Sequence, residues 1–177
     1  MLIRPHCVII VALMDDRYFM GEALAEAIEA GAVGDIPVGA VAVHDGRIIA
    51  RGHNRKEAGR DPTAHAEVIV LRETARVLGG WRLTGVTLYC TLEPCPMCAG
   101  AMVQARLPLL VYAVDDPKAG AAGSVLELLN HPRLNHRVEV RTGVLADEVT
   151  AMMEDFFAAL REGRVPRWSR RPRPAGQ

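Results

Sequence analysis

Two short segments constrain the fold more than any other feature of the chain. They are His65-Ala66-Glu67 and Pro94-Cys95-Pro96-Met97-Cys98, and twenty-eight residues lie between His65 and Pro94. Cys95 and Cys98 are three residues apart, which places both sulfurs on one face of a helix. In the first turn of a helix, the free N–H groups and the positive end of the helix dipole favour thiolates. We therefore expect the fold to bring the first turns of two helices together, one carrying His65 and the other the two cysteines.

This set of side chains predicts a zinc site. Two thiolates and one imidazole are common zinc ligands, and two thiolates balance the charge of the ion. The fourth position either holds water or is closed by a protein ligand. Glu67 projects to a different side of its helix from His65, so its carboxylate is expected to reach the water rather than the ion. Zinc bound to two thiolates is a weak Lewis acid, so the water needs a base nearby, and Glu67 fits that role.

Three other interpretations of the same residues stay open. Cys90 lies just upstream on a predicted strand and would close a structural zinc site. A Cys-x-x-Cys pair also occurs in redox proteins. His65 taken alone would be an ordinary buried histidine. The combination of His-x-Glu with Pro-Cys-x-x-Cys favours a catalytic metal over these alternatives.

Length, charge and cysteine content narrow the class of protein. The 177 residues suit one domain. Because 21 basic residues cancel 21 acidic ones, a strongly basic protein surface for binding nucleic acid is excluded, whereas a local basic patch is not. Four unevenly spaced cysteines indicate a reducing cytoplasm rather than a disulfide framework. The apolar run over residues 7–14 is too short to cross a membrane. We expect Met14 to be the true start, with residues 1–13 a loose extension or an annotation artefact.

Hydrophobic periodicity predicts an α/β chain. The order of the expected elements implies a mixed sheet with helices on both faces. Strands are expected over residues 38–44, 47–53, 86–92, 109–114 and 137–141, with Asp45-Gly46 as a type I′ turn between the first two. Helices are expected over residues 16–31, 63–78, 95–106, 124–129 and 147–161, with a polar loop over 54–62 and a glycine-rich loop over 115–123.

The two segments resemble the signature of the zinc-dependent cytidine/adenosine deaminase superfamily. Residues 118–124 and 135–140 are similar to the bacterial tRNA-specific adenosine deaminases, which convert the wobble adenosine of an anticodon to inosine, and the likeness extends over about residues 16–161. The resemblance implies a three-layer α-β-α cytidine-deaminase-like fold around a mixed five-stranded sheet. It divides the chain into an extension (1–15), a deaminase domain (16–162) and an Arg/Pro-rich, disordered tail (163–177).

The resemblance also implies roles for individual residues. Water activated at a zinc ion held by His65, Cys95 and Cys98 attacks C6 of adenine, while Glu67 passes protons to ring N1 and then to the leaving amine. Asn54, Ile36, Ala66, Leu92, Asp116 and Lys118 match substrate-binding positions. Leu92 stands where Phe is common in the family. Alternatives remain open for some of these residues: a turn or cap for Asn54, ordinary core for Ile36 and Leu92, and a solvated loop for Asp116, where Asp115 is a neighbouring candidate.

The expected partner is a tRNA anticodon stem-loop, whose single-stranded bases are accessible without opening a duplex. The family also implies a homodimer, and Ala99, Met102 and Val103 are expected to face a second copy unless they are buried within one chain. Two other functions stay open. One is a deaminase of free guanine, cytosine or cytidine, and the other is a non-enzymatic zinc module.

Overall fold

The computed structural model describes the backbone of residues 5–166 and the side chains of residues 16–166. Five strands form one mixed sheet in the order β2-β1-β3-β4-β5. The β1 strand pairs antiparallel with β2 and β3, whereas β3, β4 and β5 run parallel to one another. The strands are β1 (Gly39–His44), β2 (Arg47–His53), β3 (Val86–Leu92), β4 (Leu109–Val114) and β5 (Glu139–Thr142).

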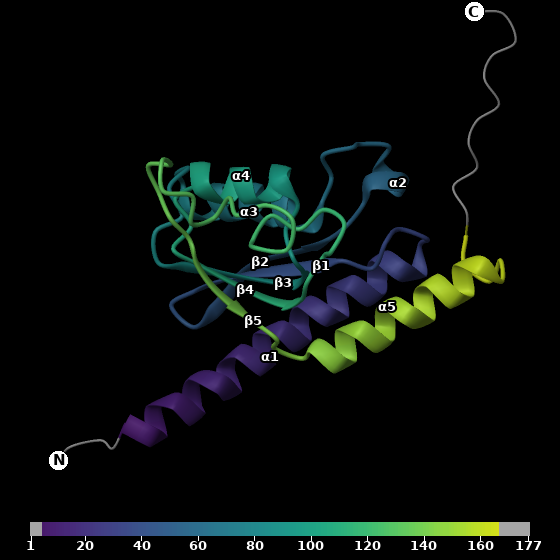
Figure 1. Cartoon of the computed structure of the whole chain (residues 1–177), viewed down its shortest axis with the longest axis horizontal. Helices are drawn as coiled ribbons and strands as arrows, with labels where there is room; N and C mark the ends of the chain where they lie inside the picture. The colour runs from purple at the N-terminus through teal and green to yellow at the C-terminus, as the bar shows by residue number, and fades with distance from the viewer. Residues whose placement is uncertain (1–4, 167–177) are drawn as a thin grey trace, which may run out of the picture.

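Helices cover both faces of this sheet (Figure 1). One face carries the two helices that begin at the predicted metal ligands, and the other carries the first and last helices of the chain. The predicted three-layer α/β architecture is confirmed. The helices are α1 (Pro5–Ala32), α2 (Lys56–Gly59), α3 (Ala66–Leu78), α4 (Pro96–Gln104) and α5 (Ala146–Arg161).

The alternation of side chains along β1 separates two hydrophobic cores. Ala40 and Ala42 pack with residues of α3 and α4, whereas Val41 and Val43 pack with residues of α1 and α5. Successive strand residues point to opposite faces, so one short strand contributes to both layers. The small alanines on the first face allow α3, which carries Glu67, to lie close to the sheet.

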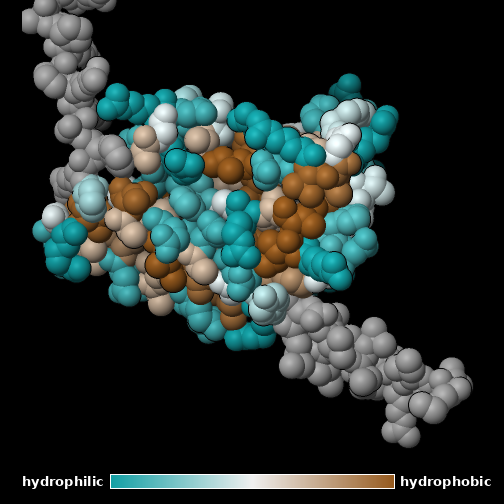
Figure 2. Space-filling model, turned by 180° about the vertical axis from the view of Figure 1, so that it is seen from behind, coloured by the Kyte–Doolittle hydropathy of each residue, from teal (hydrophilic) through white to brown (hydrophobic). Residues whose placement is uncertain are grey.

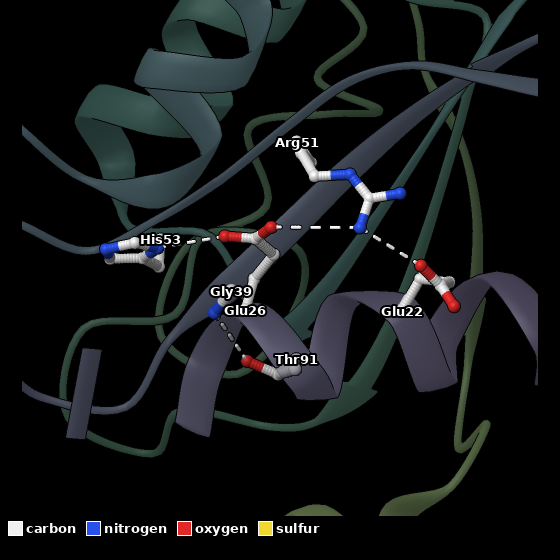
Figure 3. A network of polar contacts seen from close by, with 6 residues as sticks. All are labelled: Glu22, Glu26, Gly39, Arg51, His53 and Thr91. Atoms are coloured by element: carbon white, nitrogen blue, oxygen red, sulfur yellow. Dashed lines mark hydrogen bonds and ion pairs between the residues drawn. The ribbon is translucent and has the colours of Figure 1, made fainter. Parts of the chain in front are cut away.

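Glycine at position 39 allows α1 to approach the start of β1. A Cβ atom there would lie 2.1 Å from the carbonyl oxygen of Ala23 and 2.4 Å from the backbone nitrogen of Ala27. The Gly39 N–H donates to the Thr91 hydroxyl at 3.2 Å, and nearby the Glu26 carboxylate contacts His53 at 2.9 Å (Figure 3). These contacts fix the end of β2, where the chain continues directly into Asn54.

Several predicted elements differ from the structure, and the strand expected over residues 137–141 is shifted to Glu139–Thr142. The first helix extends back to Pro5, well before the predicted start at residue 16. The loop 54–62 contains the short helix α2, because the buried Asp35 carboxylate accepts the N–H groups of Glu57 and Ala58 at 2.7 and 3.0 Å. Residues 124–129 form turns and an isolated bridge between Ala122 and Glu127 instead of a helix.

Two alternatives were open for the apolar face of α4, contact with a second copy or burial within one chain, and the structure shows burial. Ala99, Met102 and Val103 are buried in the core of their own chain, against the sheet, and are not available to a second copy. The exposed side of α4 carries Met97 instead. Seen from behind, the molecule is mainly hydrophilic with separate apolar patches (Figure 2).

Among the described residues, no helix combines the length and apolar character needed to cross a membrane. The arginines of the C-terminal tail beyond residue 166 lie outside the described residues, as do the side chains of the N-terminal extension.

Candidate metal centre and catalytic pocket

The chain presents His65 and Cys95 at equivalent places, each as the N-cap of a helix. His65 has an extended backbone (φ −76°, ψ 147°) and precedes α3, and Cys95 (φ −71°, ψ 170°) precedes α4, whose first residue is Pro96. The helix α3 begins at Ala66 rather than at the predicted Thr63. The Asp61 carboxylate accepts both the N–H and the hydroxyl of Thr63, at 2.8 and 2.7 Å, and holds that residue in a turn. The two helix N-termini therefore converge with their positive dipole ends toward one point.

The ligand atoms have the spacing of a tetrahedral metal site. His65 Nδ1 lies 3.7 Å from Cys95 Sγ and 3.6 Å from Cys98 Sγ, and the two sulfurs are 3.6 Å apart. Zinc bonds of about 2.3 Å to sulfur and about 2.0 Å to nitrogen give tetrahedron edges of about 3.5–3.8 Å. The three side chains fit a zinc ion without rearrangement, and they form the group of potential ligands found among the described residues.

Mutual contact changes the protonation of these three side chains. The pKa of Cys95 is lowered to about 3, chiefly because the Cys98 thiol lies against it, with a further contribution from His65. The pKa of Cys98 is raised by the same contact and by burial, and that of His65 is raised by its hydrogen bond with Cys95. One thiolate is thus already stabilised at neutral pH, ready for a cation.

Glu67 lies beside this group in a state suited to proton transfer. Its side chain is only 3% exposed, and its Oε2 atom is buried without a hydrogen-bond partner. Burial raises the pKa of the carboxyl above its usual value, while the nearby backbone and His65 act in the opposite direction. A buried carboxyl with a free oxygen is costly to stability and is common where the group handles protons.

Cys90 does not complete the ligand set. It is not part of the three-residue group, and its thiol donates to the carbonyl oxygen of Leu92 at 3.1 Å. Burial raises the pKa of Cys90 well above its usual value, so this sulfur stays a neutral thiol. The arrangement disfavours a site closed by Cys90 and leaves the fourth position to a water molecule or a substrate.

A cavity of about 270 Å³ opens onto these residues. It brings together the ligands His65 and Cys95, the acid Glu67 and five of the six predicted substrate residues, and Cys98 is buried behind it. The predicted substrate residues on its wall are Ile36, Asn54, Ala66, Leu92 and Asp116. Lys118 does not line this cavity. It lies in a wider groove that adjoins the cavity and runs along α5.

The geometry distinguishes some of the open alternatives. Asn54 is 6% exposed and donates through Nδ2 to the Ile36 carbonyl at 3.2 Å, which fixes its side chain on the cavity wall. Of the two neighbouring aspartates, Asp116 reaches the cavity, while Asp115 lines the outer groove and accepts the Tyr112 hydroxyl at 3.0 Å.

Two charged residues at the cavity were not among the predicted site residues. Lys56 lines it because Asp35 anchors α2 beside it, a contact over twenty residues that no local pattern signals. Glu93 lines it and is 2% exposed. An acid at the end of a buried strand, next to a metal-binding proline–cysteine segment, is the signal that could have identified Glu93.

Glu93 accepts hydrogen bonds from several donors in the following loop. Burial alone would raise its pKa, but bonds from the Ser124 hydroxyl and from the N–H groups of Asp116, Ser124 and Ala122 outweigh burial and lower the pKa. The carboxylate of Glu93 is therefore charged and fully engaged, in contrast with that of Glu67.

The fold and this site, with a group of three side chains that could hold a metal ion, are those of a deaminase, and comparison with known proteins agrees. A family model described as MafB19-like deaminase matches residues 14–161, and the chain belongs to this family. A tRNA-specific adenosine deaminase of Bacillus subtilis (strain 168) is 47% identical over 150 residues, covering 85% of this chain and 93% of that protein. The resemblance to tRNA-specific adenosine deaminases that the sequence motifs indicate is thereby confirmed.

Solved structures give the same result. One, from studies of A-to-I editing by tRNA:A34 deaminases at the wobble position of transfer RNA, has a TM-score of 0.74 and 44% identity over 76% of this chain and 98% of that chain. A guanine deaminase from Nitrosomonas europaea has a TM-score of 0.71 but only 25% identity, over 80% of this chain and 84% of that chain. The fold is common to both activities, whereas sequence identity is much higher to the tRNA deaminase.

Proposed function

We propose that this protein is a zinc-dependent hydrolase that converts adenosine to inosine at the wobble position of a tRNA anticodon. The observation that carries the proposal is the pairing of Glu67 with the His65, Cys95 and Cys98 group. A buried carboxyl with a free oxygen stands beside three ligands at zinc spacing. The identity of 47% to a tRNA-specific adenosine deaminase supports adenosine in tRNA as the substrate.

His65, Cys95 and Cys98 would hold one zinc ion per chain. Such an ion would supply a Lewis acid that lowers the pKa of a water molecule, and Glu67 would supply the base. Glu67 would accept a proton from the attacking water and donate it to ring N1 of adenine, and would then carry the remaining proton of the hydroxyl added at C6 to the departing amine. Its pKa, raised by burial, suits a carboxyl that has to hold a proton between these steps.

The cavity walls position the base. Asn54, held by the Ile36 carbonyl, presents its amide to the nucleotide, and Ala66 leaves room for the purine beside Glu67. Ile36 and Leu92 offer apolar surface on which the base packs. These residues suit a base that leaves the anticodon loop and enters a closed pocket.

Contacts to the rest of the RNA are assigned to the rim of the cavity. We assign Asp116 to the preceding nucleotide, and Lys118 and Lys56 to phosphates, because these side chains line the cavity and the adjoining groove. The wider groove beside α5 gives room for the anticodon stem-loop beyond the flipped base; its size and not its charge supports this assignment, because four acids line it beside two basic residues: Asp115, Asp116, Glu154 and Asp155 beside Lys118 and Arg161.

Two further parts of the proposal concern assembly and location. We propose that the protein forms homodimers through the apolar hollow between α3 and α4. Trp81 on the rim of this hollow is 54% exposed, and a large exposed apolar side chain beside an apolar hollow is typical of a contact surface. We assign the protein to the cytoplasm, because thiolate ligands such as Cys95 and Cys98 persist in a reducing compartment.

The competing function is deamination of a free base or nucleoside, as in the guanine deaminase of similar fold. Ammonia release separates the two. We expect the zinc-loaded protein to release ammonia with an adenosine-34 tRNA and not with guanine, cytosine or cytidine. Release from a free base alone would favour the competing function.

A further inference from the structure

Glu93 connects the end of β3 to the loop that closes the catalytic cavity. Its Oε1 atom accepts the N–H groups of Ala122 and Ser124 at 2.8 and 3.1 Å. Its Oε2 atom accepts the N–H of Asp116 at 2.9 Å and a short hydrogen bond from the Ser124 hydroxyl. One buried side chain thus receives four hydrogen bonds from a single loop.

The four donors come from both ends of that loop, residues 115–124, so the carboxylate holds the loop closed. Between the two ends the loop supplies Asp116 and Ala119 to the cavity wall and Lys118 to the outer groove. Asp116 in turn accepts the N–H groups of Lys118 and Ala119 at 2.9 and 3.2 Å. The position of each rim residue therefore depends on the position of Glu93.

The arrangement requires a carboxylate in particular. Each oxygen faces at least one backbone N–H group, which cannot accept a hydrogen bond, and only the Ser124 hydroxyl could reverse its bond. Glutamine has nearly the same shape but replaces one oxygen with an NH₂ group, which would face N–H or O–H donors. Gly120 adds a steric requirement, because a Cβ atom there would lie 2.1 Å from Oε2.

We propose that Glu93 is a positioning residue for substrate recognition. Its carboxylate fixes the conformation of loop 115–124, which is the part of the cavity wall that contacts the RNA. Glu93 acts on binding of the nucleotide and not on the proton transfers, which belong to Glu67. The inference rests on the proposed function, since it assigns the loop to RNA contact. Its structural part, the anchoring of the loop, is measurable without activity.

The test compares Glu93→Gln with Glu127→Gln. Glu127 is exposed, lies just beyond the same loop, and accepts the N–H of Asn130 at 3.0 Å, so the control removes the same charge without touching the anchor. Zinc content, amide hydrogen exchange of residues 115–124, and kcat and KM on an anticodon stem-loop RNA are measured for both. Ser124→Ala, which removes one donor, serves as the milder variant if Glu93→Gln does not fold.

For Glu93→Gln we expect full zinc content, faster exchange in loop 115–124, and a KM about ten-fold higher with kcat within about three-fold of wild type. Ser124→Ala should increase both the exchange rate of the loop and the KM, by smaller factors. Glu127→Gln should change neither quantity. Unchanged exchange and KM, or a fall in kcat at unchanged KM, would overturn the proposal. Absence of inosine with the wild-type protein would overturn the proposed function instead, and the exchange result would still decide whether Glu93 anchors the loop.

Discussion

The backbone of Gly120 lies so close to the Glu93 carboxylate that residue 120 has no room for a side chain. A Cβ atom at residue 120 would fall 2.1 Å from Glu93 Oε2, 2.3 Å from Cδ and 2.6 Å from Oε1. The tip of a glutamate usually moves aside at little cost. Here four hydrogen bonds hold the carboxylate, so the conflict has no easy relief.

Gly120→Ala is therefore expected to destabilise the protein by about 1–3 kcal/mol, the usual range for overpacking a buried site. Denaturant unfolding measures the loss. Gly21→Ala is the matched control, because a Cβ atom at that position of α1 meets nothing within 4 Å. It should stabilise the helix by about 0.5–1 kcal/mol. Equal stability of the two variants would contradict the close contact.

The pH dependence of stability should report the charge on Glu93. Its pKa in the folded protein is lower than the usual 4.5, because the hydrogen bonds to the carboxylate outweigh burial. Such a group stabilises the folded state above its unfolded pKa, and this contribution is lost as the pH falls through the folded pKa. Glu93→Gln should cost about 1.5–3 kcal/mol at neutral pH. The difference from wild type should shrink as the pH drops below 4.5, and a difference that grows in acid would refute this assignment.

Glu67→Gln is expected to abolish turnover while the metal site stays intact. A glutamine cannot accept and release protons, and general acid–base catalysis contributes about 10²–10⁴-fold to a rate. Glu73→Gln on the same helix is the control, because Glu73 is exposed and pairs with Arg76 at 3.5 Å. Inosine formation and zinc content are measured together. Activity of Glu67→Gln close to that of the control would remove Glu67 from the mechanism.

Replacing single cysteines with alanine should distinguish the metal ligands from a cysteine that does not bind the metal. Cys98→Ala deletes one of three atoms at zinc spacing, whereas Cys90→Ala deletes a thiol bonded to the Leu92 carbonyl. Metal analysis of the purified variants should give one zinc per chain for Cys90→Ala and less than a tenth of that for Cys98→Ala, on the order expected when a ligand is lost. Loss of zinc from Cys90→Ala would indicate a closed, structural site.

Most of the sheet was predictable, because alternating apolar residues and a short turn sequence determine where its strands begin and end. The strand Arg47–His53 begins and ends as expected. Asp45 and Gly46 have φ angles of 50° and 70°, the pair of positive values that a type I′ turn requires. The metal group was also predictable, since helix geometry fixes the two cysteines relative to each other.

Long-range contacts account for the segments that the sequence did not predict. The expected helix over residues 124–129 is replaced by turns because Glu93 holds Ser124, and the Leu126 N–H donates to the Gly120 carbonyl at 3.1 Å. Asp35 stabilises α2 in the same manner, although it precedes Glu57 by 22 residues in the sequence. Hydrophobic periodicity depends only on residues that are neighbours along the chain. It therefore cannot predict the conformation of a loop that is held by a buried acid from a distant part of the sequence.

The central claim is that this site deaminates the first anticodon base of a tRNA. Its most direct measurement is to incubate the purified, zinc-loaded protein with a tRNA whose anticodon begins with adenosine and to sequence the product. We expect inosine at that position and at no other adenosine of the RNA. Unchanged adenosine there, with zinc bound and the protein folded, would contradict the account.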